Sequence, residues 1–401
     1  MFSVILVYFF IPVVIPAIRN EYGCFISVNR NINEPQPLIL NKAGTSILEP
    51  KIEPDIIEIP EGGKFKLACV GNHLFADGKT YSEIETVTCR SGLFSIQNDL
   101  YNFGQITCEY YPENIARYSG FFCGGNYREI EIGFQLPKRF LRLVGICFDP
   151  LVQTTLYSKY LLTSSIYGRQ HNFSRPSWIE DDFYHFGEDT VNMIYSQKRQ
   201  LQTINSLLGL DPESKEIVDT STKHYLARGH LTAKADFIFG IQQQVTFHLV
   251  NVAPQWEIFN ENNWLAVEND VRNYAIDRNA TLEVYTGTYG VMTLPHSKTG
   301  EQIEVYLYNE GEEVGLPVPL LYWKAVYNRK TKSGVVVIGV NNPYIDDVSD
   351  AIICEDISKS ISWGSWSKKD FVNGYIYVCT LEDFAEKVPY FPKLDVRGTL
   401  T

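Results

Sequence analysis

Eight cysteines constrain the fold of this 401-residue chain more than any other feature. An even number of cysteines, without the C-x-x-C spacing of a zinc site, favours disulfide bonds, which form in oxidising compartments. Five of the eight lie before residue 128, which predicts a small module held together by disulfides. The spacing leaves the connectivity open, except that we expect Cys354 to pair with Cys379.

The N-terminus carries an apolar segment. Residues 1–17 are uncharged and almost wholly apolar, and the first polar cluster, Arg19-Asn20-Glu21, follows them. We interpret residues 1–17 as a secretory signal peptide, because the alternative, a membrane anchor, needs about 20 apolar residues. The protein is therefore expected to be secreted, extracellular and without stable membrane association. Glycosylation sequons at Asn172 and Asn279 fit an exported glycoprotein.

The composition predicts a folded protein and limits how it can bind nucleic acid. With 45% hydrophobic and 20% charged residues, the chain has the composition of a globular protein with a large core. Its net charge of −12 excludes a protein that binds nucleic acid mainly through a basic surface. Phosphates would have to meet a bound metal and a few local cations, namely Lys223, Arg228, Lys234 and Arg272.

The pattern along the chain predicts an α+β fold of antiparallel strands with packed helices. We expect a cysteine-rich β module over residues 21–127 and a second domain over 128–401. Residues 184–210 have partly helical spacing, closed by Gly209 and Pro212.

A strand, loop and helix are expected around the most informative motif. The β-branched content predicts a strand over residues 246–252, which Pro254 would end. Asn262 or Asn263 would then cap a helix that runs to about Ile276.

The motif is Arg228-Gly229-His230, followed by Asn260, Glu268 and Arg272. In a strand, Arg228 and His230 point to the same side. The later three residues form a drifting stripe along one side of a helix. Strand and helix can therefore face each other across one metal ion.

Each residue suits one task in phosphodiester hydrolysis. His230 would be the general base that deprotonates the attacking water, so the rate should climb through about pH 6 to 7. Asn260 would give an oxygen to Mg²⁺, or to Mn²⁺ in its place, and Glu268 would hydrogen-bond the waters of the metal. Arg228 and Arg272 would stabilise the charge on the phosphate.

The chain contains the segments RGHLTAKA, NVAPQ and FNENNW in this order. In sequence and spacing they resemble the DNA/RNA non-specific endonucleases of the ββα-metal fold. Within them it is similar to the secreted insect nucleases that degrade double-stranded RNA. The resemblance implies the same roles for the five residues above, and adds Asn251 and Gln255 as supports of the metal loop. It also implies cleavage of RNA and DNA with little sequence specificity.

The resemblance has two departures. Bacterial members of the family usually have Asp before Arg-Gly-His, whereas this chain has Ala227, the residue expected in the insect group. A further phosphate-binding arginine, usually supplied upstream, has no motif here, and Arg169, Arg175 and Arg199 are all candidates.

Purely structural roles for some of these residues, and a non-catalytic function, stay open as alternatives. Arg272 could sit on a solvated helix face or pair with Glu268, and Trp363 and Trp366 could pack a turn instead of stacking a base. The alternative function is a non-catalytic secreted protein of the same fold that binds nucleic acid or recruits a partner.

Overall fold

The computed structural model of the chain describes residues 23–401 apart from 52–53, 312 and 368. The expected signal peptide, residues 1–17, lies outside the described residues. Within the described part, no helix combines the length and the apolar composition that crossing a membrane requires.

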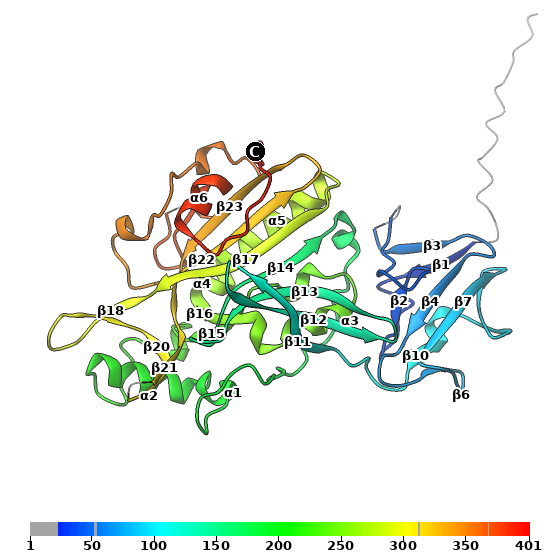
Figure 1. Cartoon of the computed structure of the whole chain (residues 1–401), viewed down its shortest axis with the longest axis horizontal. Coiled ribbons are helices and arrows are strands. Elements are labelled where there is room, and N and C mark those ends of the chain that lie inside the picture. The colour runs from blue at the N-terminus through cyan, green and yellow to red at the C-terminus, as the bar shows by residue number, and fades with distance from the viewer. Residues whose placement is uncertain (1–22, 52–53, 312, 368) are drawn as a thin grey trace, which may run out of the picture.

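The N-terminal part of the described chain consists of short strands in separate sheets (Figure 1, blue and cyan). The strands are β1 (Cys24–Ser27), β2 (Leu38–Leu40), β3 (Ile56–Ile59), β4 (Lys64–Ala68), β5 (Leu74–Ala76), β6 (Lys79–Thr80), β7 (Ile84–Arg90), β8 (Leu93–Ile96), β9 (Asp99–Tyr101) and β10 (Ile106–Cys108). They pair in the orders β2-β4-β7-β8-β9, β10-β5-β6 and β1-β3. The bridge Cys24–Cys89 joins β1 to β7, and Cys69–Cys108 joins the residue after β4 to β10, so both connect different small sheets, as expected for a disulfide-stapled module.

An antiparallel sheet with the order β11-β12-β13-β14-β17-β22-β23-β24 forms the centre of the molecule. Its strands are β11 (Ile115–Cys123), β12 (Tyr127–Leu136), β13 (Arg139–Asp149), β14 (Thr154–Leu162), β17 (Leu282–Val291), β22 (Pro319–Asn328), β23 (Ser333–Val340) and β24 (Ile376–Cys379). The predicted α+β class with antiparallel strands is confirmed.

The boundary expected between residues 127 and 128 falls inside the β11–β12 hairpin of this sheet. The change from the small sheets to the central one comes earlier, between β10 and β11. The bridge Cys123–Cys147 then ties β11 to β13. The division into two domains stays a prediction, and its boundary would have to move toward β10.

The remaining elements cover the sheet or connect its strands. They are η1 (Phe103–Gln105), η2 (Ser164–Gly168), α1 (Val191–Ile194), α2 (Gln197–Leu208), η3 (Thr220–Thr222), β15 (Leu226–His230), η4 (Lys234–Asp236), α3 (Gly240–Gln244), η5 (Val245–Phe247), η6 (Leu249–Asn251), β16 (Val252–Trp256), α4 (Glu257–Phe259), the π-helical turn η7 (Asn260–Trp264), α5 (Leu265–Asp277), β18 (Thr293–Pro295), β19 (Gln302–Glu304), β20 (Tyr306–Glu310), β21 (Glu313–Pro317), η8 (Ser349–Ala351), η9 (Ser358–Ser360) and α6 (Leu381–Lys387). Gly209 ends α2 in the left-handed conformation, with φ 64°, as its sequence predicts.

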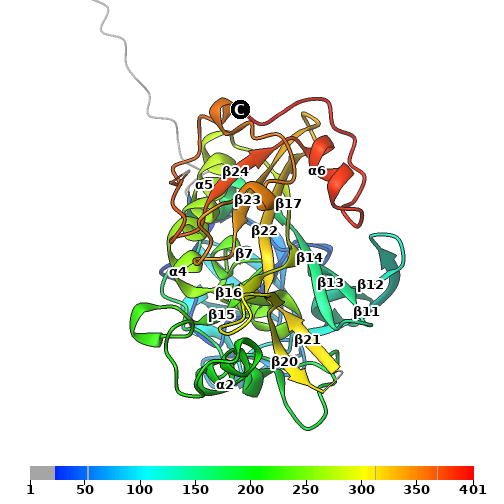
Figure 2. The ribbon, with the colours of Figure 1, turned by 90° about the vertical axis from the view of Figure 1, so that its left-hand side faces the viewer.

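The central sheet has two buried faces, because neighbouring residues of a strand point to opposite sides. Lys324 of β22 points toward α5, where it lies over the Trp264 ring. Its neighbour Trp323 packs against Phe384 of α6 on the other side. Figure 2 shows α5 and α6 on opposite sides of β22 and β17. We call these the α5 face and the α6 face.

The predicted pairing of Cys354 with Cys379 is confirmed. Cys379 ends β24, and Cys354 belongs to the irregular segment before it. The bridge therefore fastens that segment to the edge strand of the sheet, beside the apolar cluster that covers the α6 face.

Two local expectations are wrong. Residues 246–252 form the 3₁₀ turns η5 and η6, and the strand β16 begins only at Val252. Pro254 lies inside β16 and does not end it. A two-stranded sheet leaves each strand one unpaired edge, where proline is tolerated. The side chains of Tyr322 and Asn341 anchor β16 by hydrogen bonds to the carbonyls of Ala253 and Pro254, at 2.7 and 3.2 Å.

Candidate active site

Strands β15 and β16 form a two-stranded antiparallel sheet that presents the Arg-Gly-His motif. Gly229 lies against β16 and the central sheet. A Cβ atom at this position would come within 2.4 Å of Gln255 Oε1 and 2.7 Å of Tyr322 Oη. Glycine is thus required for β15 to approach this closely, and Arg228 and His230 are left to point away from that contact.

The helical segment after β16 begins earlier than the sequence predicts. It starts with α4 at Glu257, so Asn262 and Asn263 do not cap it. Both lie inside the π-helical turn η7. Asn263 instead donates hydrogen bonds to the carbonyls of Ser367 and Gly374, at 2.9 and 2.6 Å.

The π-helical turn aligns the two helical site residues. In a regular α-helix, the eight residues from Asn260 to Glu268 turn through about 800°, which leaves them about 80° apart. A π turn accommodates one extra residue, which removes roughly 100° of this rotation and leaves an offset of about 20°. Asn260 and Glu268 therefore lie on one face of the continuous segment α4–η7–α5, more closely aligned than a regular helix would place them.

One cavity collects the predicted site residues. It has a volume of about 830 Å³ and is lined by Arg228, His230, Asn260, Glu268 and Arg272, among others. The imidazole and the amide thus reach the same cavity from two separate segments. Of the other expected local cations, Lys234 lines this cavity and Lys223 does not.

His230 lies in an aromatic surrounding. Its ring centroid is 4.9 Å from that of Trp178 and 5.0 Å from that of Phe247. Its Nε2 atom is buried and has no hydrogen-bond partner within the described residues. Burial, and then the nearby charge of Arg175, lower the pKa of His230 to about 3. The imidazole is therefore neutral at neutral pH, with a nitrogen that can accept a proton.

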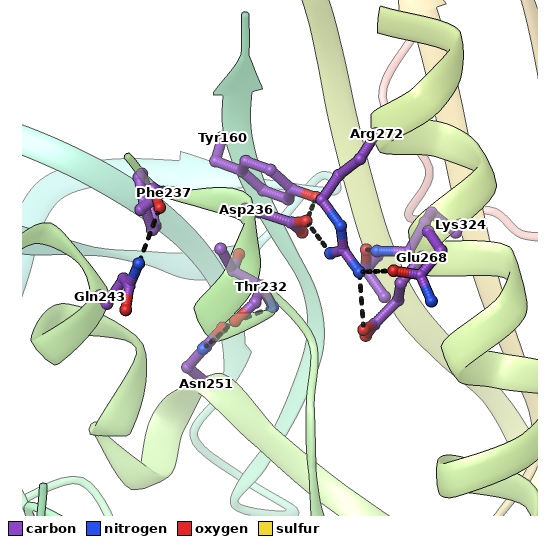
Figure 3. Close-up of polar contacts among 11 residues, drawn as sticks. Tyr160, Thr232, Asp236, Phe237, Gln243, Asn251, Glu268, Arg272 and Lys324 are labelled. Carbon is purple, nitrogen blue, oxygen red and sulfur yellow. Dashed lines mark hydrogen bonds and ion pairs between the residues drawn. The ribbon is translucent and has the colours of Figure 1, made fainter. Parts of the chain in front are cut away.

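Arg272 is buried in a network of charged and polar groups (Figure 3). Its Nη1 atom donates to Asp236 Oδ1 at 2.5 Å, and its Nη2 atom is 3.9 Å from Glu268 Oε2. Tyr160 donates to the same aspartate. The Arg272 side chain is only 3% exposed, so the interpretation that it lies on a solvated helix face is wrong. Its i,i+4 ion pair with Glu268 is present.

Asp236 was not identified from the sequence. It lies in the short turn η4, six positions after His230, and no local motif marks it. On the other side of the network, Lys324 is fully buried and donates to Thr286 Oγ1 at 2.6 Å. Burial raises the pKa of Glu268 to about 7, although Arg272 and Lys324 both oppose this shift.

The arginines at the cavity differ in how they are held. Arg228 donates from Nη2 to Asn192 Oδ1 at 2.9 Å, and its guanidinium lies 5.1 Å from the centroid of the Tyr195 ring. Arg175 is exposed and also lines the cavity, where its guanidinium is 5.7 Å from the centroid of the Trp178 ring. Of the three upstream candidates only Arg175 reaches this cavity, which its sequence surroundings could not reveal.

Asn251 and Gln255 lie behind the cavity and do not line it. Asn251 Nδ2 donates to the Thr232 carbonyl, and its Oδ1 accepts from the Thr232 amide, at 2.9 Å each (Figure 3). Asn251 Nδ2 also donates to the Thr246 carbonyl at 2.9 Å. These bonds fix the loop that follows His230. Gln255 is fully buried against Gly229.

The donor atoms in the cavity fit a hard, hydrated cation. Asn260 uses its amide nitrogen to donate to Glu257 Oε2 at 3.0 Å, so its oxygen is the atom available to a cation. The described residues contain no group of three or more histidine, cysteine or acidic side chains suited to bind a metal. An amide oxygen with the carboxylates of Glu257 and Glu268 in the same cavity matches Mg²⁺, which keeps several of its waters.

The remaining aromatic and histidine candidates lie elsewhere. Trp363 and Trp366 pack against each other, with ring centroids 5.5 Å apart, and Trp363 also packs on Tyr274 of α5. They therefore pack a turn and do not line the cavity. His224 is bonded locally to Thr222 and lies outside the cavity lining.

Comparisons relate the chain to a family model, to salivary proteins and to one solved structure. The family model for DNA/RNA non-specific endonucleases matches residues 129–384. A salivary endonuclease of Lutzomyia longipalpis is 28% identical over 379 residues, which cover 93% of this chain and 85% of the relative. The salivary protein Tsal2A of Glossina morsitans morsitans is 25% identical over 392 residues, which cover 94% of each chain. A chain in the crystal structure of the EndoG/EndoGI complex is similar over 65% of this chain and 89% of its own length, with a TM-score of 0.39 and 14% identity.

The Asp236→Ala substitution tests the buried network. It leaves the Arg272 guanidinium buried without its closest anion, so the free energy of unfolding should fall by roughly 3–5 kcal/mol. Denaturant unfolding measures this change. The matched control is Asp277→Ala at the exposed end of α5, which should change stability by less than about 0.5 kcal/mol. Equal effects of the two substitutions would contradict the network.

The pKa shifts give opposite pH effects on stability, measurable as Tm in chelator. The folded-state pKa of His230, about 3, is below its usual 6.5, so its contribution to stability is lost as the pH falls below about 6.5 toward 3. The folded-state pKa of Glu268, about 7, is above its usual 4.5, so its contribution is lost as the pH rises from about 4.5 through 7.

We expect His230→Gln to reduce the loss of Tm as the pH falls from about 6.5 toward 3, and Glu268→Gln to reduce the loss as the pH rises from about 4.5 to 7. Unchanged slopes in both variants would contradict the assignment. The lowered pKa places the protonation of His230 below pH 6, and the rise in rate expected through about pH 6 to 7 stays a prediction that a pH–rate profile would test.

Proposed function

This chain belongs to the DNA/RNA non-specific endonuclease family and is a nuclease, and we propose that it is a secreted, magnesium-dependent enzyme that hydrolyses RNA, including double-stranded RNA, and DNA. The observation that carries the proposal is the convergence of His230, Asn260 and Glu268 on one cavity. Four disulfides within the described residues and the salivary relatives support secretion. Both sequon asparagines, Asn172 and Asn279, are exposed and thus open to glycosylation.

His230 is the proposed general base. Its neutral imidazole, held between Trp178 and Phe247, accepts the proton of the attacking water at Nε2. Because burial keeps the pKa of the ring low, the base is ready at neutral pH but is a weak proton acceptor until substrate and cation bind.

Asn260 would hold the cation, and Glu268 would accept hydrogen bonds from its water ligands. Mg²⁺ bound there supplies charge stabilisation at the phosphate and the leaving oxygen. The family is one of metal-dependent nucleases, and the choice of Mg²⁺ rests on the oxygen donors of this cavity. Glu268 needs its ionised form for this task, which its surroundings disfavour below about pH 7.

Arg228 and Arg175 are the proposed phosphate contacts. Arg228 is fixed by Asn192, whereas Arg175 is exposed at the aromatic wall of the cavity. Arg272 is engaged by Asp236 and Glu268, so we assign it mainly to holding Glu268 in place and adding positive charge to the cavity. Contacts to phosphate do not read bases, which supports cleavage with little sequence specificity.

The direct test is the cleavage of double-stranded RNA and plasmid DNA by the purified protein, with magnesium and with chelator. His230→Ala should lower kcat by about 10²–10⁴-fold, because the water loses its proton acceptor. The matched control is His224→Ala, which changes a histidine outside the cavity lining and should keep activity.

Intact substrates after incubation in magnesium would contradict the proposal. Binding of both nucleic acids without cleavage would favour the alternative, a secreted protein of this fold that sequesters nucleic acid. Equal loss of activity in His230→Ala and His224→Ala would remove His230 as the base.

A second test separates the upstream arginines. Arg175→Ala should lower kcat/KM by about 10–100-fold, since it removes one charge-assisted phosphate contact. Arg199→Ala is the matched control, because Arg199 is paired with Asp189 at 2.9 Å and with Glu310 at 2.6 Å outside the cavity. A larger loss in Arg199→Ala than in Arg175→Ala would contradict this assignment.

A further inference from the structure

We propose that the end of the central sheet formed by the start of β13, the end of β14 and the β22–β23 turn carries a second nucleic-acid-binding groove, which holds the phosphodiester backbone of long substrates outside the catalytic cavity. The proposal rests on the nuclease function and adds a surface for polymer binding to it. We call this surface the basic groove and define it by Arg139, Arg142, Lys159, Arg329, Lys332 and Lys393.

Two adjoining cavities form the basic groove. One, of about 470 Å³, lies between the N-terminal part and strands β13 and β14, and Arg139 and Arg142 line it. The other, of about 360 Å³, is lined by Arg329, Lys332 and Lys393. Lys159 lines both, so the two cavities meet at this side chain.

The strand order explains why these cations are neighbours. Arg139 begins β13, Lys159 lies near the end of β14, and Arg329 and Lys332 belong to the turn between β22 and β23. In the order β13-β14-β17-β22-β23 these positions fall at the same end of the sheet. With strands about 4.8 Å apart, four intervals make a row of roughly 19 Å.

The basic groove shares no lining residue with the catalytic cavity, although its first cavity reaches Tyr160 and Asp236 of the Arg272 network. Tyr160 points to the α5 face, where it donates to Asp236. Its neighbour Lys159 points to the other side, with its Nζ atom 4.9 Å from the centroid of the Tyr285 ring. A polymer bound in the groove would therefore leave the catalytic cavity free.

The charges in the basic groove favour a polyanion. Although the whole chain carries −12, the first cavity is lined by three cations and two acids, Glu49 and Asp236, and the second by four cations and two acids, Glu283 and Asp395. Glu283 pairs with Arg329, and Asp395 with Lys332. Among the ion pairs of the described residues, none involves Lys393 or Arg139, and both side chains are exposed.

Like charges crowd around Lys159. Burial lowers its pKa, the positive charges of Arg142 and Arg329 lower it further, and Glu283 and Glu129 oppose these shifts. Such crowding disfavours the charged form, and a bound anion would relieve it. A row of cations fits a repeating anion, and the ligand with that chemistry for a nuclease is the nucleic-acid backbone.

The test uses exposed cations that are not needed for the fold. In the His230→Ala protein with chelator, Arg139→Gln with Lys393→Gln should weaken binding of a long RNA duplex by about tenfold or more. The slope of log affinity against log salt should become shallower by about 1.5–2, because two phosphate contacts are lost. With His230 present, kcat/KM should fall on the long duplex and stay unchanged on a trinucleotide, which cannot span both sites.

The matched control is Lys298→Gln with Lys359→Gln, two exposed lysines outside the groove, which should leave affinity and slope unchanged. A second groove variant, Lys332→Gln, removes a cation whose partner Asp395 is exposed, so no buried acid is left unpaired. Unchanged affinity in both groove variants, or an equal loss in the control, would overturn the proposal. Cleavage of the trinucleotide by the intact protein reports on the nuclease function separately.

Discussion

The ion pair between Arg272 and Asp236 is the constraint on which the geometry of the candidate site depends. Both side chains are 3% exposed, and a buried charge without its partner is strongly destabilising. The pair joins α5 to the turn η4 that follows His230, while Tyr160 connects the same aspartate to β14. Strand, helix and sheet are thus held at fixed distances by groups that need one another, and the cavity lies between them.

The backbone contributes a second constraint that side chains alone could not supply. Gly229 lets β15 lie directly against Gln255 and Tyr322, and the π-helical turn brings Asn260 onto the face of Glu268. Both features lower local stability but fix the positions of site residues. A glycine in a strand and a π-helical turn are each less favourable than the regular alternative. Their presence at the two ends of one cavity is what a site with strict geometry requires.

The sequence predicted those features that depend on residues close to one another along the chain. The alternation of Arg228 and His230, the end of α2 at Gly209 and the pair Cys354–Cys379 could all be anticipated. Residues 246–252 could not, because β-branched content favours a strand while Asn251 bonds across the loop to Thr232 and fixes turns instead. The sequence did not reveal the positions of Asp236 and Arg175 in the site for the same reason, because their contacts are with segments distant in sequence.

Acidity and nucleic-acid chemistry are compatible in this chain because its cations are concentrated. Non-specific affinity for a polyanion grows with the number of phosphates neutralised, so a chain of net charge −12 holds substrate weakly over most of its surface. The guanidinium groups of Arg175 and Arg228 act instead within one cavity beside aromatic rings, and reduced solvent screening strengthens the contact of the half-buried Arg228. Weak global attraction with strong local contact favours release of the cleaved product, since few contacts must break for each fragment to leave.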